Sequence, residues 1–366
     1  MTENSTQKKP IIIIGSGLAG YVLAKEFRKL NQSTPLVIIT NSEGHFYSKP
    51  LLSTALTHQR SPKDLITTDV EKIATELRAR ILACTTVTAI KTQQQKIVID
   101  NESSHYAALV LAVGAEPIHL PLQEKVYSVN NLEDYVLFRK AIEGKKRIGI
   151  IGAGLVGCEF ANDLVNGGYE VDVFALSSYP MDRFVPEPIG RVLQHGLAEK
   201  GVRWHLNQKF GTHDCNLLFS AVGLRPNVTL AKQAGITVNQ GIVVDRYLQT
   251  NCKNIYALGD CAEVNGLSWQ FVAPLMQCAR ALAKTLAGEP TQVSYPIMPI
   301  IVKTPACPLV FYPPVINKKG EWKIEGKGKD WQALFYDETN KLQGFALTGE
   351  KTRDKIIWSK QILPPS

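Results

Sequence analysis

The sequence predicts an α/β protein built on parallel sheets, and two observations support this. The pattern G-x-G-x-x-G occurs twice, at 15–20 and 152–157, each time between a run of apolar β-formers and a helical stretch. Continuous apolar runs at Leu109–Val113 and Leu217–Val222 are typical of strands buried on both faces of a sheet. We therefore expect two Rossmann-like nucleotide-binding domains of the three-layer ββα type and a small α+β C-terminal domain.

Each glycine motif is expected to bind a dinucleotide. The first glycine allows a tight turn, the second lets the backbone approach a pyrophosphate, and the third lets helix and strand pack closely. The helix that follows offers free N–H groups and a positive dipole end to the phosphates. The predicted phosphate-binding residues are Gly15, Ser16, Gly17, Leu18, Ala19 and Gly20 in the first motif and Gly152, Gly154, Leu155, Val156 and Gly157 in the second.

The remaining elements follow from periodicity and from turn residues. We expect strands at 11–14, 36–40, 81–90, 96–100, 109–113, 147–151, 171–174, 202–206, 217–222, 254–258, 332–336 and 342–347. Helices are expected at 21–30, 70–80, 158–166, 189–199, 273–286 and 353–362.

Composition limits the function classes. The 366 residues are 45% hydrophobic and 20% charged, which is typical of globular domains. Seven scattered cysteines without a C-x-x-C pair argue against a disulfide framework, a zinc site and a dithiol redox centre, and we predict no metal site. The net charge of +8 describes either a solvated basic surface or a surface that attracts an acidic partner, and no nucleic-acid motif is visible.

No apolar run approaches the length of a membrane span, and residues 1–10 are polar. We therefore expect a cytoplasmic protein that makes no membrane contact.

Several stretches together resemble the pyridine-nucleotide-dependent flavoprotein reductases. They are the two glycine motifs, V-G-A-E-P at 113–117 and I-Y-A-L-G-D-C-A-E at 255–263. Further stretches, including Y-S-K-P at 47–50 and V-K-T-P-A-C-P at 302–308, resemble the members of this superfamily that reduce rubredoxin with NADH. The resemblance implies FAD at the first motif and NADH at the second.

The resemblance also implies a domain division and further site residues. An FAD-binding domain would comprise 1–117 and 245–291, an NAD-binding domain inserted in it 118–244, and a C-terminal domain 292–366. The implied cofactor-binding residues outside the glycine motifs are Thr40, Lys49, Pro50, Ala112, Gly114, Glu159, Gly223, Gly259, Asp260 and Lys303.

Lys49, Glu159 and Lys303 are the catalytic candidates that the resemblance implies. Lys303 would favour negative charge on the reduced flavin, and Glu159, in the first turn of its helix, would pair with Lys49. A lysine on a loop is more often a solvated charge, and a first-turn acid is also favoured by the helix dipole alone. The helix at 273–286 would direct its positive end at the flavin.

Three features depart from the expected pattern. Thr40 and Asn41 stand where an acid would hold the adenosine ribose of FAD. After the strand at 171–174 there is neither an acid nor a basic residue that would bind a 2′-phosphate, and the lack of the basic residue favours NADH. Arg183 is close enough in sequence that NADPH stays an alternative. The segment 207–216 is too short for the β-hairpin flap usual in the NAD domain.

The resemblance implies hydride transfer from NADH to FAD, followed by single-electron transfer to rubredoxin, a small acidic iron protein. Such a reaction would feed a rubredoxin-dependent pathway such as alkane hydroxylation. An NADH:ferredoxin reductase and an NADH oxidase are the alternative enzymes, and a flavin-binding interaction protein without turnover is the alternative outside enzymes.

Overall fold

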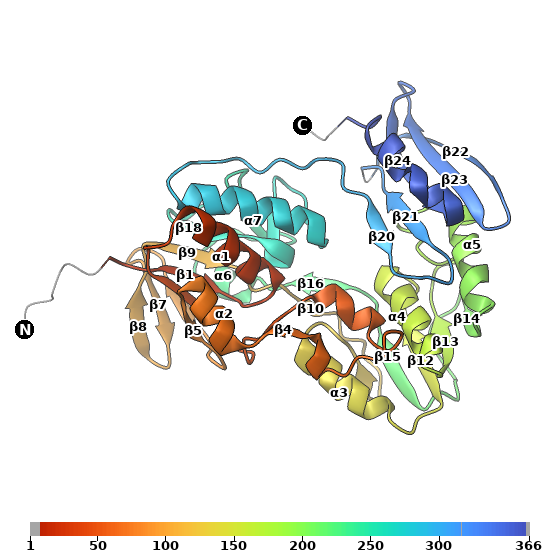
Figure 1. Ribbon diagram of the computed structural model, residues 1–366, viewed down its shortest axis with the longest axis horizontal. Helices are drawn as coiled ribbons and strands as arrows, with labels where there is room; N and C mark the ends of the chain where they lie inside the picture. Colours follow the sequence, from red (N-terminus) through yellow and green to blue (C-terminus); the bar gives the residue numbers. More distant parts are fainter. Residues whose placement is uncertain (1–7, 316, 364–366) are drawn as a thin grey trace, which may run out of the picture. The chain divides into compact units, whose positions relative to one another are not determined.

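The computed structural model describes residues 8–315 and 317–363 (Figure 1). The chain divides into two compact units, each assembled from three separate stretches. The first unit comprises 1–48, 66–116 and 224–295, and the second comprises 49–65, 117–223 and 296–366. The predicted division into FAD, NAD and C-terminal domains groups 49–65 and 224–244 differently, and it stays a prediction.

A five-stranded parallel sheet forms the centre of the first unit, in the order β18-β9-β1-β2-β5. All four residues of β1 are buried, as their apolar run predicts for a central parallel strand. The strands are β1 Ile11–Ile14, β2 Leu36–Ile39, β5 Arg80–Leu82, β9 Ala108–Leu111 and β18 Ile255–Ala257.

Two long helices of this unit, α1 (Leu18–Leu30) and α7 (Val272–Leu286), lie side by side (Figure 1). An antiparallel sheet of β6, β7 and β8 supplies a second β layer, whose Ile90 and Ile97 belong to the same buried core as β1. The other elements are β3 Phe46–Tyr47, β4 Ile66–Thr68, α2 Val70–Leu77, β6 Ala89–Lys91, β7 Lys96–Ile99, β8 Glu102–His105, α6 Thr229–Gln233, β17 Ile242–Val244, η3 Gly259–Cys261 and β19 Ala262–Val264. Short strands β10 Ala115–Pro117 and β16 Leu224–Pro226 pair with each other.

A second parallel sheet, ordered β11-β15-β12-β13-β14, forms one part of the second unit. Its elements are β11 Val126–Tyr127, α3 Leu132–Ile142, β12 Arg147–Ile151, α4 Leu155–Asn166, β13 Glu170–Phe174, α5 Glu187–Ala198, β14 Val202–His205 and β15 Leu217–Ser220. The described residues between β14 and β15 form no strand. The segment 207–216 therefore contains no β-hairpin flap. The short helices η1 Lys49–Thr54 and η2 Lys63–Leu65 also belong to this unit.

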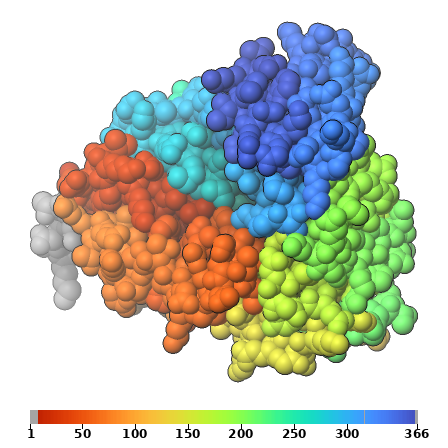
Figure 2. All heavy atoms as spheres, turned by 45° about the vertical axis from the view of Figure 1, so that its right-hand side comes forward, coloured from red at the N-terminus to blue at the C-terminus, as the bar shows by residue number. Residues whose placement is uncertain are grey.

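The C-terminal part of the second unit is a five-stranded antiparallel sheet, ordered β20-β21-β24-β23-β22. It comprises β20 Ile300–Val302, β21 Leu309–Tyr312, β22 Gly320–Lys327, β23 Asp330–Asp337 and β24 Leu342–Thr348, followed by η4 Gly349–Asp354 and α8 Lys355–Ser359. Its atoms, coloured blue, fill one continuous region in Figure 2. The expected small α+β domain is therefore present.

The α/β prediction is confirmed, and its errors lie in element bounds. Helices α1 and α4 begin three residues earlier than expected because each glycine turn leads directly into its helix. The expected strand 81–90 is wrong, because the chain turns after β5 and Cys84 has a positive φ of 49°. The expected helix 353–362 is only partly α-helical, since η4 precedes the short α8.

In the described ranges, no helix combines the length and the apolar character that crossing a membrane requires.

Candidate functional site

The three glycines of the first motif are required for different reasons. A Cβ at Gly15 would overlap the carbonyl oxygen of Ala112, and a Cβ at Gly20 would overlap that of Gly15. These two glycines therefore serve the close approach of helix and strands. Gly17 differs, because a Cβ there would meet nothing within 4 Å and its φ of −66° suits any residue. Neither packing nor backbone conformation requires glycine at this position, which leaves room for a bound group.

The N-terminus of α1 is suited to an anion. Gly17 is the N-cap and supplies no side-chain cap, and the first turn contains no acidic residue. Backbone N–H groups at such an end are directed away from the helix and carry its positive dipole end. This end of α1 therefore has the features of an anion-binding site, and the assignment of Gly17, Leu18 and Ala19 to a phosphate stays a prediction.

A cluster of hydroxyl groups lies at the end of β2, where the dinucleotide-binding motif predicts an acid. Ser16 Oγ donates to Thr40 Oγ1 at 2.8 Å, and Thr40 Oγ1 lies 2.9 Å from Ser42 Oγ. Ser16 and Thr40 are each 6% exposed. Three linked hydroxyls can both donate and accept hydrogen bonds. They can therefore serve a ribose hydroxyl, and Ser42 is a member that the sequence reasoning missed.

Gly259 and Asp260 are brought to the first motif by the fold. Gly259 has a φ of 78°, and a Cβ there would lie 2.7 Å from Ala19 Cβ in the first turn of α1. Asp260 follows in η3, at the carboxyl end of β18, which is the edge where open α/β sheets bind ligands. Ala112 and Gly114 follow β9 at the same edge.

The second motif repeats the geometry of the first within the second unit. A Cβ at Gly152 would lie 2.6 Å from the carbonyl oxygen of Ala221, and one at Gly157 would overlap the carbonyl oxygen of Gly152. Gly154 is the uncapped N-cap of α4, has a φ of −77°, and a Cβ there would meet nothing within 4 Å. Leu155 and Val156 open α4, and Gly223 lies three residues beyond the end of β15.

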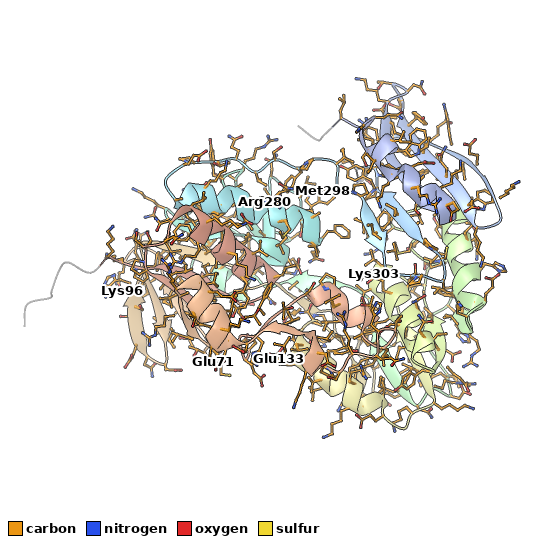
Figure 3. All side chains as sticks on the ribbon, viewed as in Figure 1. Glu71, Lys96, Glu133, Arg280, Met298 and Lys303 are labelled. Atoms are coloured by element: carbon orange, nitrogen blue, oxygen red, sulfur yellow. The ribbon has the colours of Figure 1, made fainter. Side chains whose placement is uncertain are left out.

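A buried acid links three separate segments of the second unit. Glu159 is 2% exposed, and its carboxylate accepts hydrogen bonds from Ser53 Oγ at 2.8 Å and from the Lys303 backbone N–H at 3.0 Å. Lys303 Nζ forms an ion pair with the same carboxylate and lies 3.0 Å from Ser53 Oγ. Figure 3 labels Lys303 beside the ribbon of α4. This Ser53–Glu159–Lys303 cluster holds a cation at a fixed place after β20.

The expected pairing of Glu159 with Lys49 is replaced by this cluster. Lys49 Nζ instead donates to Asn130 Oδ1 at 2.7 Å, just before the N-cap of α3. Glu159 is also the fifth residue of α4, beyond the first turn in which we expected it. Both lysines approach α4, but the Glu159 carboxylate is bound by Ser53, near the far end of η1 from Lys49, and by Lys303, whereas Lys49 Nζ binds the chain before α3.

Other polar side chains of α4 fix the neighbouring chain. Asp163 is fully buried and accepts backbone hydrogen bonds from Leu56 at 3.1 Å and Thr57 at 2.7 Å. Burial raises the pKa of its carboxyl, and these hydrogen bonds oppose that shift. Asn162 Oδ1 accepts from the Ala306 backbone N–H at 3.4 Å. These hydrogen bonds fix the chain just after η1 and the segment after Lys303 against α4.

The residues of both motifs fit dinucleotide cofactors. The open position at Gly17, the uncapped end of α1 and the hydroxyls near Thr40 would hold the pyrophosphate and ribose of FAD. The open position at Gly154 and the uncapped end of α4 would hold those of NADH. The sequence reasoning missed Ser53, Asn162 and Asp163, because their partners lie more than 100 residues away along the chain.

Two family patterns match the chain. The pattern described as pyridine nucleotide-disulphide oxidoreductase matches residues 9–283. The pattern described as rubredoxin binding C-terminal domain matches residues 292–362.

Relatives match over nearly the full length. The chain is 42% identical to a rubredoxin-NAD(+) reductase of Alcanivorax borkumensis, covering 96% of this chain and 98% of the relative. It is 40% identical to a rubredoxin-NAD(+) reductase of Acinetobacter baylyi, covering 97% and 98%. The solved NADH:rubredoxin oxidoreductase of Clostridium acetobutylicum shares the fold with a TM-score of 0.84 at 22% identity, covering 97% of this chain and 94% of that one.

Proposed function

Because the chain belongs to the pyridine nucleotide-disulphide oxidoreductase family, we propose that it is an FAD-dependent reductase that passes electrons from NADH to rubredoxin. The observation that carries this proposal is the pair of open glycine positions, Gly17 and Gly154, each at an uncapped helix N-terminus. The choice of rubredoxin rests on the two relatives named as rubredoxin-NAD(+) reductases and on the match of the C-terminal domain.

FAD would supply the conversion of a two-electron hydride donor into single electrons for a one-iron acceptor. The chain's own residues bind and orient the cofactors. Gly17 and the N-terminus of α1 bind the FAD pyrophosphate, and Asp260 binds the adjoining ribityl region. Gly154 and the N-terminus of α4 bind the NADH pyrophosphate. The N-terminus of α7, which has no side-chain cap, would favour negative charge on a flavin bound beside it.

Lys303 is the proposed flavin-facing cation, and Glu159 and Ser53 are its positioning residues. A lysine side chain has four rotatable bonds, so its charge acts at a defined point only when partners hold it. The ion pair with Glu159 and the 3.0 Å approach to Ser53 Oγ provide these partners. Lys49 and Pro50 are assigned to the same region by resemblance.

The domain assignment and the location are parts of the proposal. Residues 1–117 and 245–291 would bind FAD, 118–244 NADH and 292–366 the acceptor. The cytoplasm is the proposed location, and a rubredoxin-dependent pathway such as alkane hydroxylation is the proposed use of the electrons.

Anaerobic stopped-flow absorbance of the yellow holoenzyme tests the proposal. NADH should bleach the flavin, and added oxidised rubredoxin should restore the colour at the rate at which rubredoxin is reduced. Restoration by ferredoxin alone would favour a ferredoxin reductase, and rapid oxygen consumption without any partner would favour an NADH oxidase. Tight FAD binding without bleaching by NADH would indicate a non-catalytic flavin protein.

A further inference from the structure

Helix α4 carries a row of polar side chains along one face. Glu159, Asn162, Asp163 and Asn166 lie at positions i, i+3, i+4 and i+7, which share one side of an α-helix. The first three are only 2%, 3% and 0% exposed, and Asn166 is exposed at the end of the row. Buried polar groups need hydrogen-bonding partners. Two other segments of the second unit provide them for this α4 polar row.

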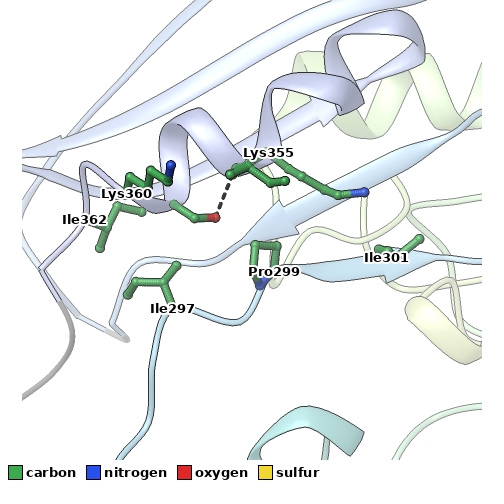
Figure 4. A pocket seen from close by; sticks show the side chains of 8 residues that line it. Ile297, Pro299, Ile301, Lys355, Lys360 and Ile362 are labelled. Carbon is green, nitrogen blue, oxygen red and sulfur yellow. Dashed lines mark hydrogen bonds between the residues drawn. The ribbon is translucent and has the colours of Figure 1, made fainter.

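The chain after β20 is one of these partners. Glu159 binds both the backbone N–H and Nζ of Lys303, and Asn162 Oδ1 accepts from the Ala306 N–H at 3.4 Å. Strand β20 itself holds Lys303 less firmly, because it forms the edge of its sheet. The side chain of Ile301 is 58% exposed at a groove between β20 and α8 (Figure 4). The fixed position of Lys303 is therefore set by α4.

The chain just after η1 is the other partner. The two carboxylate oxygens of Asp163 accept from the backbone N–H groups of Leu56 at 3.1 Å and Thr57 at 2.7 Å. Asn166 Nδ2 donates to Thr57 Oγ1 at 3.1 Å. Gly167, which ends α4, lets this chain come close, because a Cβ there would lie 3.2 Å from Leu56 Cβ. Hydrogen bonds and close packing thus fix the same residues.

The anchored residues are joined closely to Ser53. Backbone hydrogen bonds of 2.8–3.2 Å close residues 54–60 into one turn. Ser53, directly before this turn, has a φ of −90° and a ψ of 16°, at the point where two short helices meet within η1. Such a residue interrupts the regular hydrogen bonding of a helix, so η1 alone does not fix it. The direction of the Ser53 hydroxyl therefore depends on how the 54–60 turn is held.

Stability of the fold does not account for a carboxylate at Asp163. Burial raises the pKa of this carboxyl, so its ionised form is less favourable in the folded protein than in the unfolded chain. Buried charges can often be replaced by apolar residues without loss of stability. An apolar residue, however, cannot accept two N–H groups at fixed points. The carboxylate therefore selects one position for the turn.

We propose that Asp163 is a positioning residue for the flavin-facing cation: it holds the 54–60 turn against α4, so that Ser53 directs Lys303. This inference rests on the proposed function. Ser53 Oγ completes the path, because it lies 2.8 Å from the Glu159 carboxylate and 3.0 Å from Lys303 Nζ. Glu159 and Asp163 are four residues apart on one helix, so a single rigid element sets both ends of the path.

The flavin reduction potential of the full-length holoenzyme tests this role. Asp163→Asn keeps the size of the side chain but replaces one acceptor oxygen with an NH₂ donor, so at least one backbone hydrogen bond is lost. The variant should keep FAD, and its potential, titrated with dithionite, should fall by part of the shift that Lys303→Ala produces. Asp163→Asn should cause no further fall in a Lys303→Ala background, because Asp163 acts through Lys303.

Amide hydrogen exchange of the same proteins reports on the turn without any turnover. The Leu56 and Thr57 amides should exchange about tenfold or more faster in Asp163→Asn, as expected for the loss of a hydrogen bond to a charged group. Asp172→Asn on β13 is the matched control, because Asp172 is also buried, at 4%, and forms an ion pair with Arg203. It should leave the potential unchanged and the exchange of both amides within about twofold.

Asn166→Ala carries the test if Asp163→Asn does not fold or retain FAD. Asn166 is exposed and its side chain binds Thr57, so its removal should cause smaller changes in the same two directions.

Four outcomes separate the claims. Faster exchange of the two amides with a wild-type potential overturns the positioning role and leaves the reductase intact. Unchanged exchange overturns the anchor. A further fall in potential in the double variant shows an effect that does not pass through Lys303, which also overturns the role. A wild-type holoenzyme that NADH does not bleach overturns the proposed function instead, since the dithionite titration does not depend on NADH.

Discussion

Gly17 and Gly20 lie three residues apart in one motif, and their substitution should have opposite consequences. At Gly17 a side chain enters space that contains no protein atom within 4 Å, at an ordinary φ of −66°. At Gly20 a Cβ would overlap a backbone carbonyl oxygen that cannot move without displacing the turn. We therefore expect Gly17→Val to abolish FAD binding in a protein that folds, and Gly20→Ala to destabilise the fold itself.

The magnitudes follow from these surroundings. In the apoprotein, Gly17→Val should change the free energy of unfolding by less than about 1 kcal/mol, since no packing is disturbed and replacing glycine restricts the unfolded chain. Gly20→Ala should lower it by about 1–3 kcal/mol, the usual range for overpacking, because the helix-propensity gain of about 1 kcal/mol is smaller than the overlap. Free FAD at 100 times its Kd stabilises wild type by about 2.7 kcal/mol, and Gly17→Val should lose this increment entirely.

Two assays measure these effects separately. Visible absorbance after desalting gives the FAD content, and denaturant unfolding of the apoproteins gives their relative stability. Retention of FAD by Gly17→Val at wild-type affinity would refute the assignment of the open position to the pyrophosphate. An apoprotein of Gly20→Ala as stable as wild type would refute the packing argument.

Three further predictions concern the second motif, the cation and acid stability. Gly154→Val should keep FAD but lose bleaching by NADH in the stopped-flow assay, and full-rate bleaching would contradict the NADH assignment. Lys303→Ala should keep FAD while lowering the flavin reduction potential and slowing reduction, because Glu159 loses its cationic partner; an unchanged potential by spectroelectrochemical titration would remove Lys303 from the site. Hydrogen bonds from Thr339 and the Lys341 backbone lower the pKa of Asp337 to about 2, so its contribution to stability is present above pH 3.8 and is lost as pH falls toward 2. Asp337→Asn should therefore flatten the acid limb of the stability curve over this window, and an unchanged slope would contradict the assignment.

Local sequence patterns predicted the parts of the fold that depend on neighbouring residues. Ile11–Ile14, with four apolar β-formers before glycine, is a central buried strand as expected. Residues 81–90 were expected to be one strand because they are largely apolar or β-branched, yet the chain turns at Cys84 with a positive φ. A turn without glycine or proline leaves little signal in the sequence.

The candidate site likewise has a part that neighbouring residues predict and a part that depends on residues far apart in the sequence. The glycine motifs can be recognised from the sequence because part of their geometry is local: the close contacts of Gly20 with Gly15 and of Gly157 with Gly152 lie within one motif each. The Glu159–Lys303 pair spans 144 residues, and Ser53 lies 106 residues from Glu159. Such long-range partners are set by tertiary packing, which explains why Lys49 was expected beside Glu159 and Lys303 is found there.

Transfer of electrons from NADH through the bound flavin to rubredoxin is the central claim, and double-mixing stopped-flow under anaerobic conditions tests it most directly. The first mixing, with stoichiometric NADH, should bleach the flavin, and the second, with oxidised rubredoxin, should reduce two rubredoxins for each NADH consumed. Bleaching followed by no rubredoxin reduction, or no bleaching at all, would contradict the account.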